Sequence, residues 1–255
     1  MTELQQKYLI ISQDITQILE DIKKNWSKYP DYLGSAVLNS PIFEEPDILF
    51  IGINPGPGRF IQWNGDNWNQ KKNQFIDPSK MILPPDSKNL WRSQLQWLKS
   101  DNARNNGEWW DFSKNKKNYY PYYMCELLVR IYRHDFPNTT RKELTDIFES
   151  RIMDTNLFPM STFTTRELDR LISNYAKANN INIKTICLKQ TVDLVKLVKP
   201  RSIVLLGNTV YDVISKELDN LKIPYYCINR KVGWHAKENI LKMANDIYKM
   251  INSQK

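Results

Sequence analysis

The sequence predicts an α/β protein, a three-layer α/β/α sandwich around a short, mostly parallel four-stranded sheet. Two observations predict this class. Short and almost entirely apolar runs recur along the chain, and such runs are typical of strands buried on both faces. Segments with a helical spacing of apolar residues separate them, and this alternation favours a parallel sheet. We therefore expect a single domain over residues 1–255 that begins with a helix.

The N-terminal helix is expected over residues 4–24, because apolar residues such as Tyr8, Ile11 and Ile15 recur at spacings of three and four. The strands are expected at residues 47–53, 152–156, 201–207 and 224–228. Further helices are expected from the capping-box pair Thr164 and Glu167 onward, and over residues 183–198, 208–218 and 235–251. A long insertion without helix or strand pattern follows the first strand, at about residues 54–89. Its many amide and aromatic side chains indicate a functional loop.

Composition excludes several classes of protein. The chain is 41% hydrophobic and 12% aromatic, which argues against disorder, and no apolar run is long enough to cross a membrane. The N-terminus does not look like a signal peptide. Three dispersed cysteines and two histidines predict neither a disulfide framework nor a metal site. The net charge of +8 favours an anionic partner, a nucleic acid first and a membrane surface second. We expect a cytoplasmic monomer that binds DNA and has no membrane contact.

The most informative motif is Gly-Ile-Asn-Pro-Gly-Pro-Gly, residues 52–58, directly after the first predicted strand. In open α/β sheets, ligands bind at this carboxyl end of the strands. Arg59 and Phe60 stand where a nucleotide-binding P-loop needs Lys followed by Ser or Thr, and the dinucleotide fingerprint is also absent. The motif therefore predicts a binding site of another kind.

This motif resembles the first motif of the uracil-DNA glycosylase superfamily, and it is nearest to the mismatch-specific and single-strand-selective branches. The resemblance implies that Asn54 holds the water that attacks the sugar. Cleavage passes through an oxocarbenium-like sugar, so the water needs orientation more than deprotonation, and an amide oxygen can supply it. The resemblance also implies that the backbone at Gly52, Ile53, Pro55 and Gly56 lines the base pocket, and that no cofactor is needed.

Two later segments are similar to further elements of the same superfamily. Residues 154–159, Asp-Thr-Asn-Leu-Phe-Pro, resemble the element whose asparagine reads the flipped base, which implies this role for Asn156. An amide presents a donor and an acceptor side by side, as the edge of uracil requires. Residues 200–208 are similar to a later core strand and its glycine. Together the three blocks extend the resemblance over residues 47–251.

The sequence departs from the superfamily after its last strand, where the His-Pro-Ser motif that stabilises the departing base is absent. Asn229 falls near the place of the asparagine in the variant motif, and Arg230 could supply positive charge to the leaving base. His235 is a candidate replacement histidine, although the start of the last helix also suits contact with the DNA backbone. Arg59 and Lys231 are expected to contact DNA.

An aromatic side chain is expected to stack on the base, with Phe60 and Phe75 as the candidates and Trp63 and Trp68 as alternatives. The resemblance thus predicts a DNA glycosylase that flips uracil or a modified pyrimidine out of DNA and hydrolyses its N-glycosidic bond. Three alternatives stay open. They are a glycosylase for a larger base such as a modified cytosine, a non-catalytic DNA-binding module, and a hydrolase of free nucleosides or nucleotides.

Overall fold

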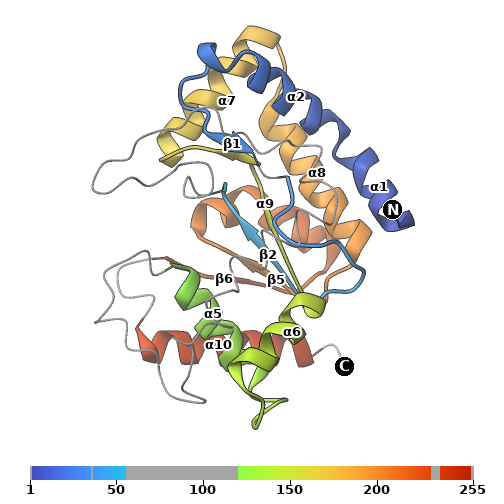
Figure 1. Ribbon diagram of the computed structural model, residues 1–255, viewed down its shortest axis with the longest axis vertical. Helices are drawn as coiled ribbons and strands as arrows, with labels where there is room; N and C mark the ends of the chain where they lie inside the picture. The colour runs from blue at the N-terminus through green and yellow to red at the C-terminus, as the bar shows by residue number, and fades with distance from the viewer. Residues whose placement is uncertain (1, 36, 56–119, 231–235, 254–255) are drawn as a thin grey trace.

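Strands β2 (Ile48–Gly52), β3 (Ile152–Asn156), β5 (Ile203–Leu205) and β6 (Tyr225–Cys227) form a parallel sheet in the order β3-β2-β5-β6 (Figure 1). The computed structural model describes residues 2–35, 37–55, 120–230 and 236–253. Each strand lies within one of the four segments that the sequence predicts. All three pairings are parallel, which confirms the predicted α/β class.

The residues of β2 are all buried, and they alternate between two hydrophobic cores. Leu49 and Ile51 belong to one core, whereas Ile48 and Phe50 belong to the other. Successive side chains of a strand point to opposite faces, so an unbroken apolar run is the pattern that a sheet covered on both sides requires.

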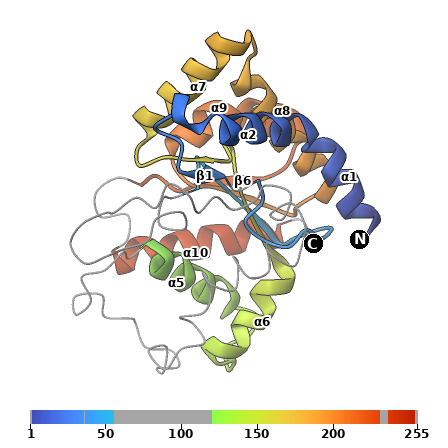
Figure 2. The ribbon, with the colours of Figure 1, turned by 45° about the horizontal axis from the view of Figure 1, so that its top comes forward.

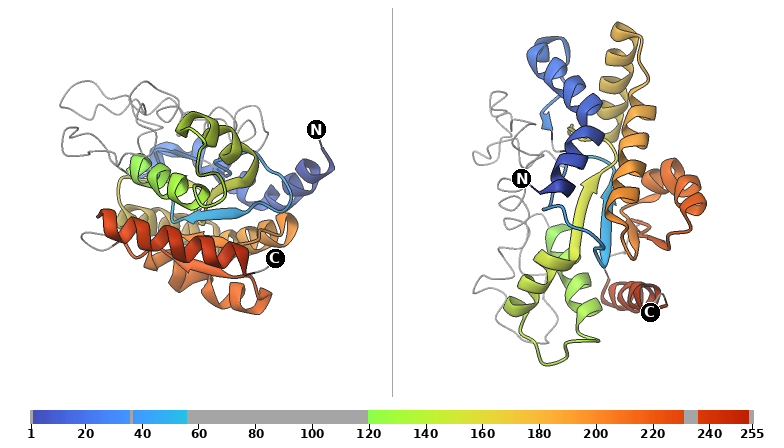
Figure 3. Two further views of the ribbon diagram at one scale, coloured as in Figure 1. Left: turned by 90° about the horizontal axis from the view of Figure 1, so that it is seen from below. Right: turned by 90° about the vertical axis from the view of Figure 1, so that its right-hand side faces the viewer.

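Helices form a layer on each face of the sheet (Figure 2). The first layer contains α1 (Glu3–Ile11), α2 (Gln13–Lys24), α7 (Thr165–Asn179), α8 (Ile183–Val198) and α9 (Asn208–Leu221). The second contains α5 (Tyr120–Tyr132), α6 (Arg141–Arg151) and α10 (Lys237–Asn252). In the first layer, α1 and α2 pack along α8 (Figure 3). The predicted three-layer sandwich is therefore confirmed.

Two expectations about the helices need correction. The N-terminal segment forms two helices, because the backbone departs from helical geometry at Ser12, whose hydroxyl donates to the Tyr8 carbonyl oxygen at 2.8 Å. Serine competes in this way for backbone partners within helices. The last helix begins at Lys237, with Ala236 as its N-cap, two residues later than expected.

A small antiparallel sheet that the sequence did not predict pairs β1 (Gly34–Ser35) with β4 (Met160–Ser161). Next to it, residues 37–40 run beside the outer edge of β3. The Asn39 amide donates to the Asp154 carbonyl at 2.9 Å, and the Asp154 amide donates to the Ser40 hydroxyl at 2.9 Å. These contacts cover the outer edge of β3.

Within the described residues, none of the helices is both long and apolar enough to cross a bilayer. The insertion expected at residues 54–89 lies outside the described residues from residue 56 onward. The division of the chain into one domain stays a prediction.

Candidate functional site

The candidate site lies at the carboxyl end of the parallel sheet, where Gly52 ends β2 and Asn156 ends β3. These two residues are partners in the parallel register. The pairing continues past the strands, because Leu157 donates to the Gly52 carbonyl at 2.8 Å and Phe158 donates to the Ile53 carbonyl at 2.9 Å. The two motifs that are about a hundred residues apart in the sequence therefore meet side by side.

The side chain of Asn156 lies across the backbone of Gly52. A Cβ atom on residue 52 would be 2.6 Å from Asn156 Oδ1, which is closer than packed side chains tolerate. An added Cβ would therefore force the Asn156 amide to move. Close approach, and not a positive φ angle, is what favours glycine here. The absence of a side chain at residue 52 is what makes room for the Asn156 amide at the sheet edge.

The amide nitrogen of Asn156 is a buried donor without an acceptor among the described residues. The residue is 7% exposed, and Nδ2 has no hydrogen-bond partner there. Buried polar groups in folded proteins are nearly always paired, because an unmet donor costs about 1–3 kcal/mol. An amide left in this state is suited to a ligand that brings its own acceptor.

Asn54 is anchored by β4 and by Thr162, the residue that follows it. Its Nδ2 atom donates to the Met160 carbonyl and to the Thr162 hydroxyl, each at 3.3 Å, and lies 3.5 Å from the Pro55 carbonyl. No hydrogen bond between described residues uses its Oδ1 atom. The side chain is half-buried, so this oxygen is the atom that Asn54 can offer to a water or a ligand.

Gly52, Ile53 and Pro55, whose backbone was predicted to line the base pocket, also help to join the ends of β2 and β3. The carbonyl groups of Gly52 and Ile53 accept the amides that follow β3, and Pro55 is buried. The structure therefore places Asn54 two residues beyond Gly52, the strand partner of Asn156, so both asparagines lie at the same end of neighbouring strands.

Asn229 and Arg230 follow β6 at the same edge of the sheet, and both are exposed. The Arg230 side chain passes over Gly207, where a Cβ would lie 3.9 Å from Arg230 Cδ. Gly207 has a φ angle of +118°, which favours glycine, and it precedes α9. Because β5 separates β6 from β2, these residues begin about 10 Å from Asn54.

Cys227 at the end of β6 does not offer a nucleophile. Burial raises the pKa of its thiol, and Sγ donates to Asn208 Oδ1 at 3.8 Å. A protonated thiol is a poor nucleophile, so this cysteine is a structural group at neutral pH.

Eight predicted site residues lie outside the described part of the chain, and their roles stay predictions: Gly56, Arg59, Phe60, Phe75, Lys231 and His235, and the alternative stacking residues Trp63 and Trp68. Conversely, Met160 and Thr162 contact Asn54 although sequence reasoning did not select them. Their position just before the capping box of α7 carries no signal for a contact with a residue more than a hundred positions earlier.

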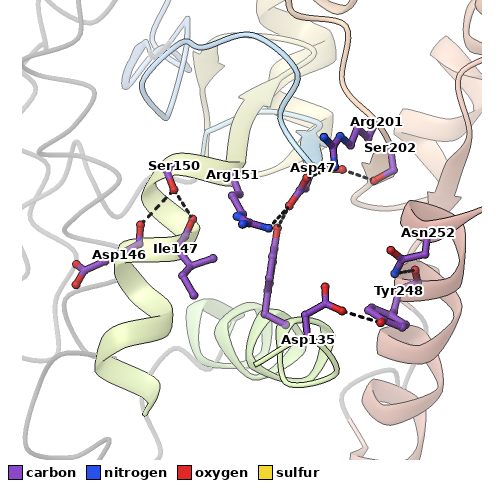
Figure 4. Close-up of polar contacts among 11 residues, drawn as sticks. Asp47, Asp135, Asp146, Ile147, Ser150, Arg151, Arg201, Ser202, Tyr248 and Asn252 are labelled. Carbon is purple, nitrogen blue, oxygen red and sulfur yellow. Dashed lines mark hydrogen bonds and ion pairs between the residues drawn. The ribbon is translucent and has the colours of Figure 1, made fainter. Parts of the chain in front are cut away.

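The opposite, amino end of the sheet carries a second polar cluster (Figure 4). The Asp47 carboxylate accepts from the Tyr132 hydroxyl at 3.1 Å and pairs with Arg151 at 3.4 Å and Arg201 at 3.3 Å. The Asp47 carbonyl accepts from Ser202 at 2.6 Å. These groups satisfy one another and join the starts of β2, β3 and β5, which is a structural role.

Burial raises the pKa of the Tyr132 hydroxyl well above its usual value, and the negative charge of Asp47 acts in the same direction. Within the described ranges, no three His, Cys, Asp or Glu side chains gather in a way that could hold a metal ion. No protein-family model matches this chain, and no curated protein matches it.

Proposed function

We propose that this protein is a DNA glycosylase that hydrolyses the N-glycosidic bond of uracil or a modified pyrimidine flipped out of DNA. One observation carries the proposal. Asn54 and Asn156 lie at neighbouring strand ends on the edge where α/β sheets bind ligands. Asn54 is anchored through its nitrogen, and Asn156 holds a donor that no described residue accepts. This arrangement supplies the two functions that the reaction needs, a group to orient water and a group to hold the base.

In the proposed reaction, Oδ1 of Asn54 accepts a hydrogen bond from a water. This bond orients the water so that a lone pair of the water oxygen faces C1′ of the sugar. The N-glycosidic bond breaks with its electron pair leaving on the base, which departs as an anion. The water adds to the oxocarbenium-like sugar and loses a proton to the solvent, and the free base takes up a proton from the solvent. The Asn156 amide donates to a carbonyl of the base. Positioning of this kind accounts for a large part of the rate in many enzymes.

Stabilisation of the departing base is the step that the asparagine pair does not supply. We assign it to positive charge from Arg230, with Asn229 beside it, because both follow β6 at the same edge. His235 is a second candidate for this step. The proposal takes the protein to act as a cytoplasmic monomer without a cofactor.

DNA as the partner is supported by the distribution of charge along the sequence. Residues 56–119 contain 11 Lys and Arg against 6 Asp and Glu, so this segment contributes +5 of the net charge of +8. Excess positive charge favours binding of the phosphate backbone of a nucleic acid.

The direct experiment measures base release from labelled oligonucleotides, followed by alkaline cleavage of abasic sites. The panel contains uracil in single strands, in U·A pairs and in U·G pairs, together with modified pyrimidines. We expect strand breaks with the wild type and a loss of at least about a hundredfold in Asn54→Ala and in Asn156→Ala. Asn174→Ala, an exposed asparagine on α7, is the matched control and should retain full activity.

The other outcomes select among the alternatives. Release of modified cytosines with little release of uracil would assign the protein to a larger base. Salt-sensitive DNA binding without release from any oligonucleotide would favour a non-catalytic binding module. Turnover of free nucleosides or nucleotides without affinity for DNA would favour a small-molecule hydrolase.

A further inference from the structure

Two hydrogen bonds link Asn54, the candidate water-holding residue, through Thr162 to the start of α7. The amide nitrogen of Asn54 donates to Thr162 Oγ1 at 3.3 Å, and the Thr162 hydroxyl donates to the Thr164 carbonyl at 2.8 Å. Thr164 is the N-cap of α7, and its side chain and backbone both exchange hydrogen bonds with Glu167. The chain of contacts therefore ends on a rigid element.

The groups around the Asn54 amide nitrogen can only accept hydrogen bonds, and this fixes the orientation of the amide. A hydroxyl has one proton, and that of Thr162 is used on the Thr164 carbonyl, so toward Asn54 it can only accept. The Met160 carbonyl and the more distant Pro55 carbonyl, at 3.5 Å, can also only accept. The two protons of the amide NH₂ group serve these acceptors. If the amide were reversed, Oδ1 would face acceptors only, and these contacts would be repulsive.

The anchoring groups are themselves held in place. Thr162 is 2% exposed and Met160 is fully buried. Met160 is part of β4, which pairs with β1, so its carbonyl is fixed by the small antiparallel sheet. The orientation of the Asn54 amide is thus determined before any ligand arrives, with Oδ1 directed away from both anchors.

We propose that Thr162 is a positioning residue for the reaction, one that holds the Asn54 amide so that its oxygen orients the attacking water. This inference rests on the proposed glycosylase function. It assigns a role to a residue that touches neither base nor sugar. Its effect is therefore expected on the rate of bond cleavage, with substrate affinity unchanged.

The test compares Thr162→Val with Thr162→Ser. Valine removes the hydroxyl at nearly the same size, and the Thr164 carbonyl still accepts the Leu168 amide at 3.1 Å, so Asn54 is the group that loses a partner. We expect the single-turnover rate of base release to fall by about ten- to a hundredfold in Thr162→Val, with KM unchanged. Serine keeps the hydroxyl and should restore most of the rate.

Thr191→Val is the matched control. Thr191 is also 2% exposed, and its hydroxyl donates to a backbone carbonyl, that of Cys187, at 3.0 Å within α8. The same substitution there removes one buried hydrogen bond without a contact to Asn54. Its stability loss should resemble that of Thr162→Val, whereas its rate should equal the wild-type rate.

A second readout reports the contact without activity. In protein labelled with ¹⁵N-asparagine, the Asn54 side-chain amide signals are identified by their loss in Asn54→Ala. We expect one of the two amide protons to move upfield in Thr162→Val and to keep its position in Thr162→Ser and Thr191→Val.

The two readouts separate the possible failures. Unchanged amide signals in Thr162→Val overturn the positioning role, and so does a changed signal with an unchanged rate. If Thr162→Val changes the amide signals but the wild-type protein releases no base, the proposed function is overturned and the Thr162–Asn54 contact has a structural role only.

Discussion

Oδ1 of Asn156 lies 2.6 Å from the position that a Cβ on Gly52 would occupy, so the present position of the amide depends on the absence of a side chain at residue 52. Gly52→Ala should push the amide out of place and lower base release by at least about tenfold, because a displacement of this size is costly in a positioned site. We also expect a loss of stability of about 1–3 kcal/mol. Rates and denaturant unfolding curves measure the two effects.

A double-mutant cycle identifies the cause. In Asn156→Ala the clashing amide is gone, and the next nearest atom to the added Cβ that would persist, the Thr155 carbonyl oxygen, is at 3.8 Å. Gly52→Ala should therefore cost little stability in that background. Equal costs in both backgrounds would mean that Gly52 is required for a reason other than the position of Asn156.

The second prediction concerns the unmet donor of Asn156. Asn156→Leu replaces a buried amide, unpaired among the described residues, with an apolar side chain of similar size. We expect unfolding free energy that is unchanged or higher by about 1 kcal/mol, together with loss of base release. Thermal unfolding of the ligand-free protein measures the first effect. A clear loss of stability would indicate that the amide serves the fold.

The sheet was predictable because each strand is an apolar run that must be buried on both faces. The alternation of Ile48 and Phe50 with Leu49 and Ile51 between two cores is the direct result. The capping box at Thr164 was also predictable, because it depends on two residues that are only three positions apart. Both patterns are local, and both were confirmed.

The contacts that build the site are not local, and the sequence did not predict them. Thr162 contacts Asn54 across 108 positions of the chain, beside the two-residue strand β4, and so short a strand leaves no periodic pattern. The break at Ser12 depends on which carbonyl its hydroxyl selects. The resemblance of two short motifs suggested Asn54 and Asn156 as a pair, and the register of β2 and β3 explains how they meet.

The third prediction separates the two ends of the sheet. Asp47→Asn weakens the pairs with Arg151 and Arg201 and changes the acceptor for Tyr132. Because both arginine side chains are about half exposed (45%), we expect a moderate cost of about 1–3 kcal/mol in unfolding free energy. The rate of base release at saturating substrate should not change. A large fall in rate for the folded variant would argue that the amino end takes part in the reaction.

The fourth prediction distinguishes two roles for neighbouring basic residues after β6. If Arg230 stabilises the departing base, Arg230→Gln lowers the single-turnover rate and leaves the salt dependence of DNA binding unchanged. If Lys231 contacts a phosphate, Lys231→Gln reduces the slope of log affinity against log salt by about one. Binding titrations at several salt concentrations, with rates on the same oligonucleotide, test both. A reduced slope in Arg230→Gln would reassign Arg230 to the DNA backbone.

The last prediction concerns stability at high pH. Burial raises the pKa of the Tyr132 and Tyr8 hydroxyls, and it raises that of Tyr32 to about 12. In the unfolded chain these groups ionise near pH 10. Above that pH the unfolded state loses protons that the folded state keeps, so stability is fully present below about pH 10 and falls as the pH rises further.

Tyr132→Phe removes one of these ionisable groups, so the decline in unfolding free energy above pH 10 should become less steep. The decline should not disappear, because Tyr8 and Tyr32 keep their hydroxyls. At pH 7 the variant should be less stable than the wild type, since Asp47 loses the donor at 3.1 Å. Denaturant unfolding at intervals from pH 7 to 11 measures both effects. An unchanged slope above pH 10 would show that Tyr132 ionises in the folded state as readily as in the unfolded chain.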